Sequence, residues 1–211
     1  MKSIKYILPC TILFSSIYAN AATQIVETFK LVTDVQSKCL DIAGYAGGKD
    51  RNAQIWHCDG YNDQRWFITD LSHYPIPLSG LDIELEAHSL QGKYLIKNAK
   101  SGLCLDIEGY DGYSNDSAQL WNCDGYLDQE WSIELAYPDP TNRHYTQPLK
   151  FVNSSPAVIG ERAVCLDVGG TSGASGNDVQ LWNCRSPHTA LGKDQIWYIT
   201  EPLIMAVPDL N

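Results

Sequence analysis

The thirteen residues QLWNCDGYLDQEW (119–131) combine two tryptophans, one cysteine and two Gln-x-Trp triplets. A close copy of this stretch is QIWHCDGYNDQRW (54–66), and a longer version is QLWNCRSPHTALGKDQIW (180–197). Together the three stretches contain all six tryptophans of the chain, two per copy. Because the same side chains return in the same order three times, we expect a chain built from three repeats of one unit.

A second cysteine precedes the cysteine of each stretch by 19 residues, and it begins Cys-Leu-Asp in every copy. The pairs are Cys39 and Cys58, Cys104 and Cys123, and Cys165 and Cys184. This equal spacing favours one disulfide within each copy, although a cyclic pairing between copies would also respect the repeat. A zinc site would need closer pairs such as Cys-x-x-Cys, which the sequence lacks.

The first 21 residues have the pattern of a secretory signal peptide. Two lysines precede an apolar stretch at 6–18, and an Ala-Asn-Ala cleavage site ends at Ala21. A membrane anchor would need about 20 apolar residues, and acylation at Cys10 would require a small residue where a proline stands. We therefore expect the mature chain, residues 22–211, to be exported to the periplasm or the medium, where disulfides form.

The chain is acidic, with a formal net charge of −10 that becomes −12 when cleavage removes Lys2 and Lys5. An acidic surface repels phosphate groups, so nucleic acid is not an expected partner. Docking onto anionic lipid is disfavoured for the same reason, and no segment after the signal peptide is long and apolar enough to insert into a membrane.

Each copy has the pattern of short strands separated by turn residues. Alternating apolar residues begin the copies at 29–33, 94–98 and 149–153, and segments such as CLDI, AQIW and RWFIT follow. Four strands in each of three copies predict an all-β, barrel-like domain with threefold pseudosymmetry. Proline-containing connectors at 71–92 and 136–148 separate the copies, and the tail at 201–211 has no clear assignment.

Cys-Leu-Asp, Gln-x-Trp-x-Cys and Gln-x-Trp, repeated three times in this order, resemble the ricin B-chain type lectins. That family consists of β-trefoil carbohydrate-binding modules. The resemblance covers about residues 25–200, with repeats at about 25–70, 90–135 and 148–200. It implies a β-trefoil with one disulfide in each four-stranded repeat and up to three sugar sites. No catalytic residue, metal ligand or cofactor is expected.

The first tryptophan of each stretch is the predicted sugar platform, on which the apolar face of a pyranose stacks while polar neighbours bind its hydroxyls. These residues are Trp56, Trp121 and Trp182. Packing against a buried disulfide is the alternative explanation for them. The second tryptophan, at Trp66, Trp131 and Trp197, stands in an apolar strand and is predicted to pack in the core.

The aspartate of each Cys-Leu-Asp can accept two adjacent sugar hydroxyls, and the resemblance implies this role opposite the platform. Capping of the glycine-rich turn that follows is the alternative. These residues are Asp41, Asp106 and Asp167. The glutamine before each platform also belongs to the predicted sites. The resemblance implies that a later aspartate is the second polar partner of the sugar and that the glutamine after it holds the loop by hydrogen bonds. These residues are Gln54, Asp63, Gln64, Gln119, Asp128, Gln129, Gln180, Asp194 and Gln195. The family often has Asn at the position of these later aspartates, and an ionised Asp cannot donate a hydrogen bond there.

The function that the resemblance implies is a secreted lectin for cell-surface or polysaccharide glycans, with galactose-type sugars as the first expectation. A separate toxin or enzyme subunit is the protein partner that the family suggests. Two other functions stay open: a glycoside hydrolase, which needs two carboxylates flanking one cleft, and a β-trefoil that binds proteins without open sugar sites.

Overall fold

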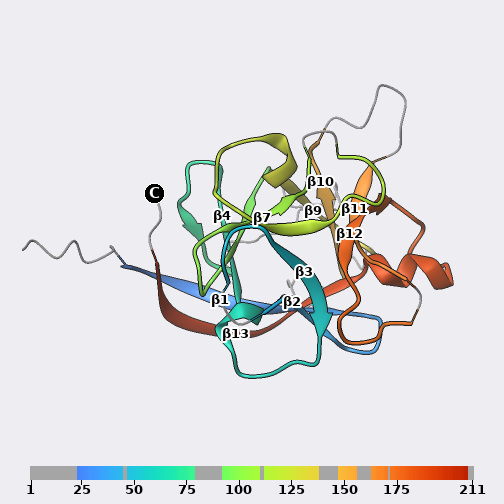
Figure 1. Ribbon diagram of the computed structural model, residues 1–211, viewed down its shortest axis with the longest axis horizontal. Helices are drawn as coiled ribbons and strands as arrows, with labels where there is room; N and C mark the ends of the chain where they lie inside the picture. The colour runs from blue at the N-terminus through green and yellow to red at the C-terminus, as the bar shows by residue number, and fades with distance from the viewer. Residues whose placement is uncertain are drawn as a thin grey trace, which may run out of the picture.

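The computed structural model describes residues 23–44, 47–78, 92–109, 112–137, 147–155, 163–170 and 172–208. Each copy supplies four strands, as predicted, and one short 3-10 helix (Figure 1). The strands are β1 (Thr23–Thr33), β2 (Cys39–Ile42), β3 (Arg51–Trp56) and β4 (Trp66–Thr69); β6 (Leu95–Asn98), β7 (Cys104–Ile107), β8 (Ala118–Trp121) and β9 (Trp131–Leu135); and β10 (Leu149–Asn153), β11 (Val164–Val168), β12 (Val179–Asn183) and β13 (Trp197–Pro208). The 3-10 helices are η1 (Asn62–Gln64), η3 (Leu127–Gln129) and η4 (Ala190–Gln195), and a short strand β5 (Pro75–Ile76) lies after the first copy.

The first and last strands of the three copies close into a six-stranded barrel. Between copies, β4 pairs with β6, β9 with β10, and β13 with β1, all antiparallel. Within each copy the barrel closes at a single residue pair: Phe29 with Trp66, Tyr94 with Trp131, and Leu149 with Trp197. The second tryptophan of every copy therefore stands where its fourth strand meets its first strand.

These three tryptophans form the centre of the core. Trp66, Trp131 and Trp197 are fully buried in one apolar cluster, which confirms the prediction for them. Each indole Nε1–H donates to the backbone oxygen of the leucine in Cys-Leu-Asp, at 3.1, 3.2 and 3.1 Å respectively. A buried indole N–H needs such a partner, so this bond joins the barrel to the strand that carries the candidate site aspartate.

Three hairpins, β2–β3, β7–β8 and β11–β12, cover one end of the barrel and meet around the pseudo-threefold axis. Each hairpin turn contains a residue in the left-handed region close to its second strand: Asp50 (φ 63°), Asn115 (φ 83°) and Gly176 (φ 89°). Such a backbone favours Gly, Asn and Asp. Their amides donate to Leu120, Leu181 and Ile55 of the neighbouring copy, so each turn lies beside the platform strand of another copy.

The predicted disulfides are confirmed, because Cys39–Cys58, Cys104–Cys123 and Cys165–Cys184 each join two residues of the same copy. Each bond ties the first strand of a hairpin to the loop that follows the platform strand. With the barrel, the hairpins and the disulfides in these positions, the architecture is the β-trefoil that the family resemblance implies.

The end of the chain differs from the sequence-based expectation, which left 201–211 unassigned. Strand β13 continues to Pro208 and pairs with β1 back to Thr23 (Figure 1). The two strands therefore form a ribbon that extends beyond the part expected to begin at residue 29. Val26 and Val207 are buried on one side of this ribbon against Phe67, a long-range contact that residue alternation in either strand does not reveal.

The predicted signal peptide and most of the two predicted connectors lie outside the described residues. The described part of the first connector includes β5, which pairs with β4. Among the described residues, no helix is long and apolar enough to cross a membrane.

Replacement of Cys104 and Cys123 by alanine is expected to lower the free energy of unfolding by roughly 3 kcal/mol, because the loop they close is no longer constrained in the unfolded chain. Urea denaturation of the wild type and the double variant measures this difference. A double variant as stable as the wild type would show that this disulfide does not stabilise the second copy.

Candidate functional site

A carboxylate held by two glutamine amides recurs in all three copies. Asp41 lies opposite Gln54 in the β2–β3 hairpin, and Gln54 Nε2 donates to Asp41 Oδ1 at 2.7 Å. Gln64, from the short helix η1, donates through its Nε2 to Asp41 Oδ2 at 2.9 Å. The equivalent bonds to Asp106 are both 2.8 Å, from Gln119 and Gln129; those to Asp167 are 3.2 and 3.1 Å, from Gln180 and Gln195.

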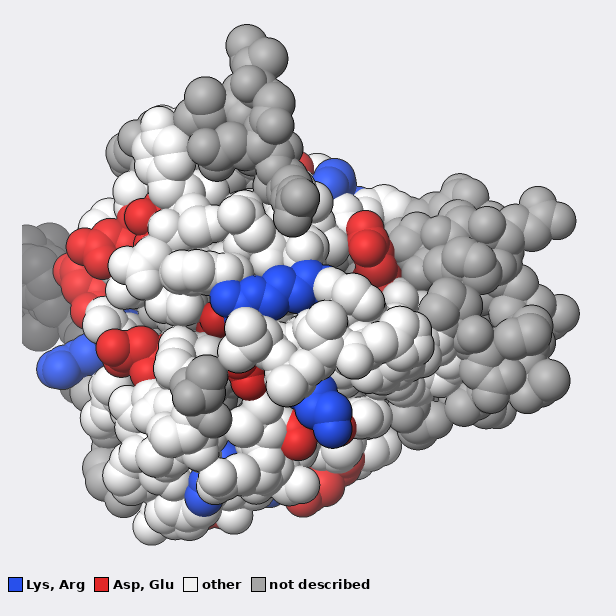
Figure 2. Space-filling model, turned by 90° about the vertical axis from the view of Figure 1, so that its right-hand side faces the viewer, with Lys and Arg blue, Asp and Glu red and all other residues white. Residues whose placement is uncertain are grey.

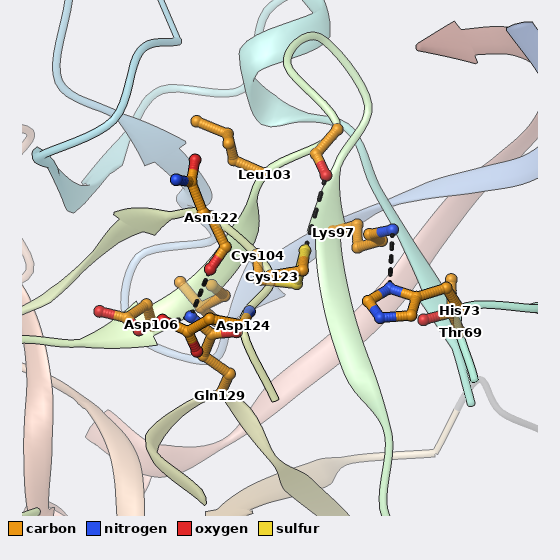
Figure 3. The surroundings of a disulfide bond; sticks show 12 residues. Thr69, His73, Lys97, Leu103, Cys104, Asp106, Asn122, Cys123, Asp124 and Gln129 are labelled. Carbon is orange, nitrogen blue, oxygen red and sulfur yellow. Dashed lines mark hydrogen bonds between the residues drawn. A yellow bond between two sulfur atoms is a disulfide. The ribbon is translucent and has the colours of Figure 1, made fainter. Parts of the chain in front are cut away.

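The fully buried glutamine of this arrangement also holds the loop after the disulfide. Gln129 Nε2 donates to the Asn122 oxygen at 2.7 Å, and Gln129 Oε1 accepts from the Asp124 amide at 3.0 Å (Figure 3). Gln64 and Gln195 make the same pair of contacts in their copies. The loop support implied for these glutamines is therefore present, and the same side chain positions the carboxylate.

The three central aspartates are almost fully buried, with exposed fractions of 6% (Asp41), 3% (Asp106) and 2% (Asp167). Burial raises the pKa of each carboxyl, and the two glutamine hydrogen bonds oppose that rise. For Asp167 the pKa is raised to about 6. Each carboxylate oxygen has two acceptor positions and its glutamine fills one, so capacity for further hydrogen bonds remains.

The first copy surrounds its platform with an open cavity of about 270 Å³. Asp41, Gln54 and Asp63 line it together with the half-buried Trp56. Asp59, the residue after the second half-cystine, also lines this cavity, and its Oδ1 accepts from the Tyr61 amide at 2.9 Å. All the predicted residues of the first copy except the buried Gln64 therefore meet at one surface.

The second copy has an equivalent cavity, again of about 270 Å³, lined by Asp106, Gln119, Trp121 and Asp128. Asp124 occupies the position of Asp59. The neighbouring first copy contributes to this site: its Asp50 lines the cavity, and its Lys49 Nζ lies 3.5 Å from the ring centroid of Trp121.

The third copy departs from the other two at Arg185, which replaces the aspartate after the half-cystine. Its guanidinium carbon lies 5.2 Å from the Trp182 ring centroid, and its Nη1 lies 3.7 Å from Asp167 Oδ2. Arg185 also donates to the Leu191 oxygen within the inserted segment. A cation of the protein itself therefore lies beside both the predicted platform and its carboxylate.

The late aspartates are buried on the 3-10 helices, with exposed fractions of 4% (Asp63), 5% (Asp128) and 5% (Asp194). Oδ1 of Asp63 and of Asp128 has no hydrogen-bond partner. Burial and the nearby carboxylates of Asp106 and Asp124 raise the pKa of Asp128 to about 6. The backbone oxygens of Asp63 and Asp128 accept from Asn98 and Asn153 of the following copy, at 2.9 Å each.

Sequence reasoning missed the residue after the second half-cystine and the contribution of the neighbouring copy. The first could have been found, because Cys-Asp-Gly occurs in two copies and Cys-Arg-Ser in the third. The second could not, because Lys49 and Trp121 are brought together only by the threefold arrangement of the hairpins.

The described surface carries no dedicated metal site, since no group of three His, Cys, Asp or Glu side chains in those residues could hold an ion. On the face shown in Figure 2, acidic and basic side chains are interspersed, and uncharged surface lies between several of the acidic groups. The acidic net charge is therefore not a single continuous patch on that face.

Comparison with known proteins gives one family model and several relatives. The model, described as ricin-type β-trefoil lectin domain-like, matches residues 83–182. Serine protease 1 of Rarobacter faecitabidus is 24% identical over 123 residues, which cover 49% of this chain and 23% of the protease.

Solved structures share the architecture. The designed threefold-symmetric protein ThreeFoil matches with a TM-score of 0.61 and 20% identity over 82% of this chain and 98% of its own, which shows the fold. The hemolytic lectin CEL-III matches with a TM-score of 0.53 and 26% identity over 82% of this chain and 30% of its own. In CEL-III and in the protease, the match spans less than a third of the relative.

The change Gln129→Leu should lower the free energy of unfolding by about 3 kcal/mol, because it leaves one buried oxygen of Asp106 and two loop groups without partners. The control Gln119→Leu removes a single bond from a half-buried side chain and should cost about 1 kcal/mol. Urea denaturation measures both; equal losses would contradict the central role of Gln129.

The change Asp128→Asn should stabilise the protein at pH 7.5 by about 1–2 kcal/mol and have little effect at pH 4. The sign follows from the raised pKa: the folded protein keeps this proton up to about pH 6, whereas the unfolded chain loses it near 3.8. The stability that this proton contributes is complete below about pH 3.8 and is lost as the pH rises through about 6, so the cost of the charge grows between these values and is full above pH 6. Unfolding free energies at the two pH values test this, with the exposed Glu134→Gln as control; an equal gain at both pH values would refute it.

Proposed function

Since the chain contains a ricin-type β-trefoil lectin domain, we propose that it is an exported, non-catalytic lectin that binds galactose-type glycans on cell surfaces or polysaccharides. The domain type supports carbohydrate binding, and the signal-like first 21 residues and three disulfides support export. The galactose preference comes from the family resemblance.

The main support for this proposal is the geometry of the first site. There, a half-buried indole, Trp56, and a carboxylate fixed from two sides, Asp41, line the same open cavity. An apolar surface beside a few fixed polar groups is the general design of a small-ligand site. Because the two glutamines hold Asp41 before any ligand arrives, little side-chain freedom is lost when a hydroxyl binds to it.

The three sites are not equivalent, and we rank the first and second copies above the third. Arg185 lies beside both the platform and the carboxylate of the third copy, so a neutral sugar must compete with a guanidinium for both groups, whereas Lys49 in the second copy lies over the platform only. In the first copy, Gly176 of the third copy lies beside Trp56. Because glycine has no side chain, the third copy places no side chain against the indole at this position. Several weak sites on one rigid body raise avidity on a dense glycan surface by a factor of 10² or more.

A separate toxin or enzyme subunit is the partner that we propose for such a lectin. Support comes from relatives in which the matching part is a minor fraction of a longer chain, namely a hemolytic lectin and a serine protease. Glycoside hydrolysis is the less favoured reading of the carboxylates, because the same arrangement recurs in all three copies, as in repeated binding sites, whereas a hydrolase needs one carboxylate pair at one cleft.

Glycan arrays and retention on immobilised lactose test the proposal. Trp56→Ala and Trp121→Ala should each weaken retention, and the double variant should lower apparent affinity at least tenfold, because the stacking surface is removed. Tyr74→Ala, which removes an aromatic side chain that is 72% exposed and outside both cavities, should bind like the wild type.

Absence of binding to any glycan, or unchanged binding by the double tryptophan variant, would contradict the proposal. Release of reducing sugar from a bound oligosaccharide, abolished by Asp41→Asn, would replace the lectin with a hydrolase.

A further inference from the structure

The cavity of the second copy is lined by more carboxylates than neutral-sugar binding requires. Five acidic side chains border it: Asp50, Asp106, Glu108, Asp124 and Asp128. None of the described residues that line this cavity is a lysine or an arginine. None of the five carboxylates forms an ion pair with another described residue. Their charges therefore add up at one small surface.

Two of these carboxylates are buried and fixed. Asp106 is held by its two glutamines, whereas Asp128 is 5% exposed and its Oδ1 has no hydrogen-bond partner. A buried carboxylate without a full set of partners is costly, and a ligand that brings positive charge into the cavity reduces that cost. The exposed Glu108 and Asp124 stand at the rim, where they can attract a cation.

The protein already places an ammonium group at this site. Lys49 Nζ lies 3.5 Å from the centroid of the Trp121 ring, which is the geometry of a cation–π contact. Lys49 belongs to an exposed turn of the first copy, so its side chain can move away into water. The indole face and the acidic cavity beside it are thus suited to an ammonium group.

We propose that the second site selects sugars that carry a free ammonium group, that is, amino sugars that are not N-acetylated. This inference rests on the proposed lectin function and names the ligand class of one of its sites. The ligand ammonium takes the place of the Lys49 ammonium over Trp121, and the rim carboxylates bind it by charge-assisted hydrogen bonds. The sugar ring occupies the cavity beside it.

The other two copies show why this selectivity belongs to the second. In the first copy three carboxylates line the cavity, and Lys100 Nζ lies 3.8 Å from one of them, Asp63. In the third copy Arg185 brings a guanidinium to the position of Asp124. The second copy thus combines more lining carboxylates than the first with an internal ammonium on its platform.

Isothermal titration of the full mature chain with galactosamine, N-acetylgalactosamine and galactose at neutral pH and low salt tests the proposal. Galactosamine should bind about tenfold more tightly than N-acetylgalactosamine, because the cation–π contact and the rim carboxylates together favour the ammonium group. The double change Glu108→Gln and Asp124→Asn should reduce that ratio several-fold, because the rim carboxylates no longer bind the ammonium. Glu134→Gln, an exposed acid on β9 outside the cavities, should leave it unchanged.

Lys49→Ala provides the second arm of the test. It removes the competing internal ammonium and should tighten galactosamine binding several-fold, with little effect on galactose. Equal binding of galactosamine and N-acetylgalactosamine would overturn the ammonium selectivity and leave the lectin function intact. Absence of binding of all three sugars to the wild type and to Lys49→Ala would overturn both.

Discussion

A buried carboxylate clamped by two glutamine amides is the interaction on which the rest of each repeat depends. One glutamine faces the aspartate across a hairpin, and the other arrives from a 3-10 helix beyond the disulfide. Burying this charge without partners would be prohibitive. The loop after the disulfide, the hairpin and the helix must therefore adopt their positions together, because the same three side chains satisfy one another.

The two tryptophans of each copy divide between this clamp and the barrel. Trp131 is fully buried and donates to the backbone of Leu105, next to Asp106, so the core fixes the strand that carries the carboxylate. Trp121 lies half-buried on the opposite strand of the hairpin and borders a cavity. One short stretch thus supplies a buried core tryptophan and a half-buried surface tryptophan. The loop between them is held by the glutamine of the 3-10 helix.

The threefold frame is constant, but the rims of the sites differ. The position after the second half-cystine is Asp59, Asp124 or Arg185, and the turn from the neighbouring copy brings a lysine to only one platform, Trp121. These side chains are exposed or half-buried, so they can vary without disturbing the clamp. The frame therefore provides three related surfaces, and the rim residues give each a different charge.

Much of the frame was predictable from the sequence, because it rests on contacts within one repeat. The equal cysteine spacing indicated the disulfides, and the apolar setting of Trp66, Trp131 and Trp197 indicated the core. The clamp itself was only partly predicted: Asp41 and Gln54 were expected at the site, but the bonds that join Asp41 to both glutamines depend on the folded hairpin and on η1.

Contacts between copies were not predictable, and two of them matter most. Lys49 reaches Trp121 only because each hairpin turn lies beside the next copy. The pairing of β13 with β1 joins residues about 180 positions apart, and no local pattern in 201–211 indicates it. In both cases the decisive partner is remote in the sequence, so neither spacing nor alternation carries the information.

The division of each repeat into two kinds of tryptophan can be tested by following the indole N–H resonances of the six tryptophans in a two-dimensional NMR titration with galactosamine or lactose. The signals of Trp56 and Trp121 should shift progressively with sugar, because these rings border the cavities. The signals of Trp66, Trp131 and Trp197 should stay in place, since their N–H groups are buried against leucine carbonyls. Shifts confined to the three core tryptophans, or no shift at any of the six, would contradict the division of each repeat into a core tryptophan and a ligand-binding tryptophan.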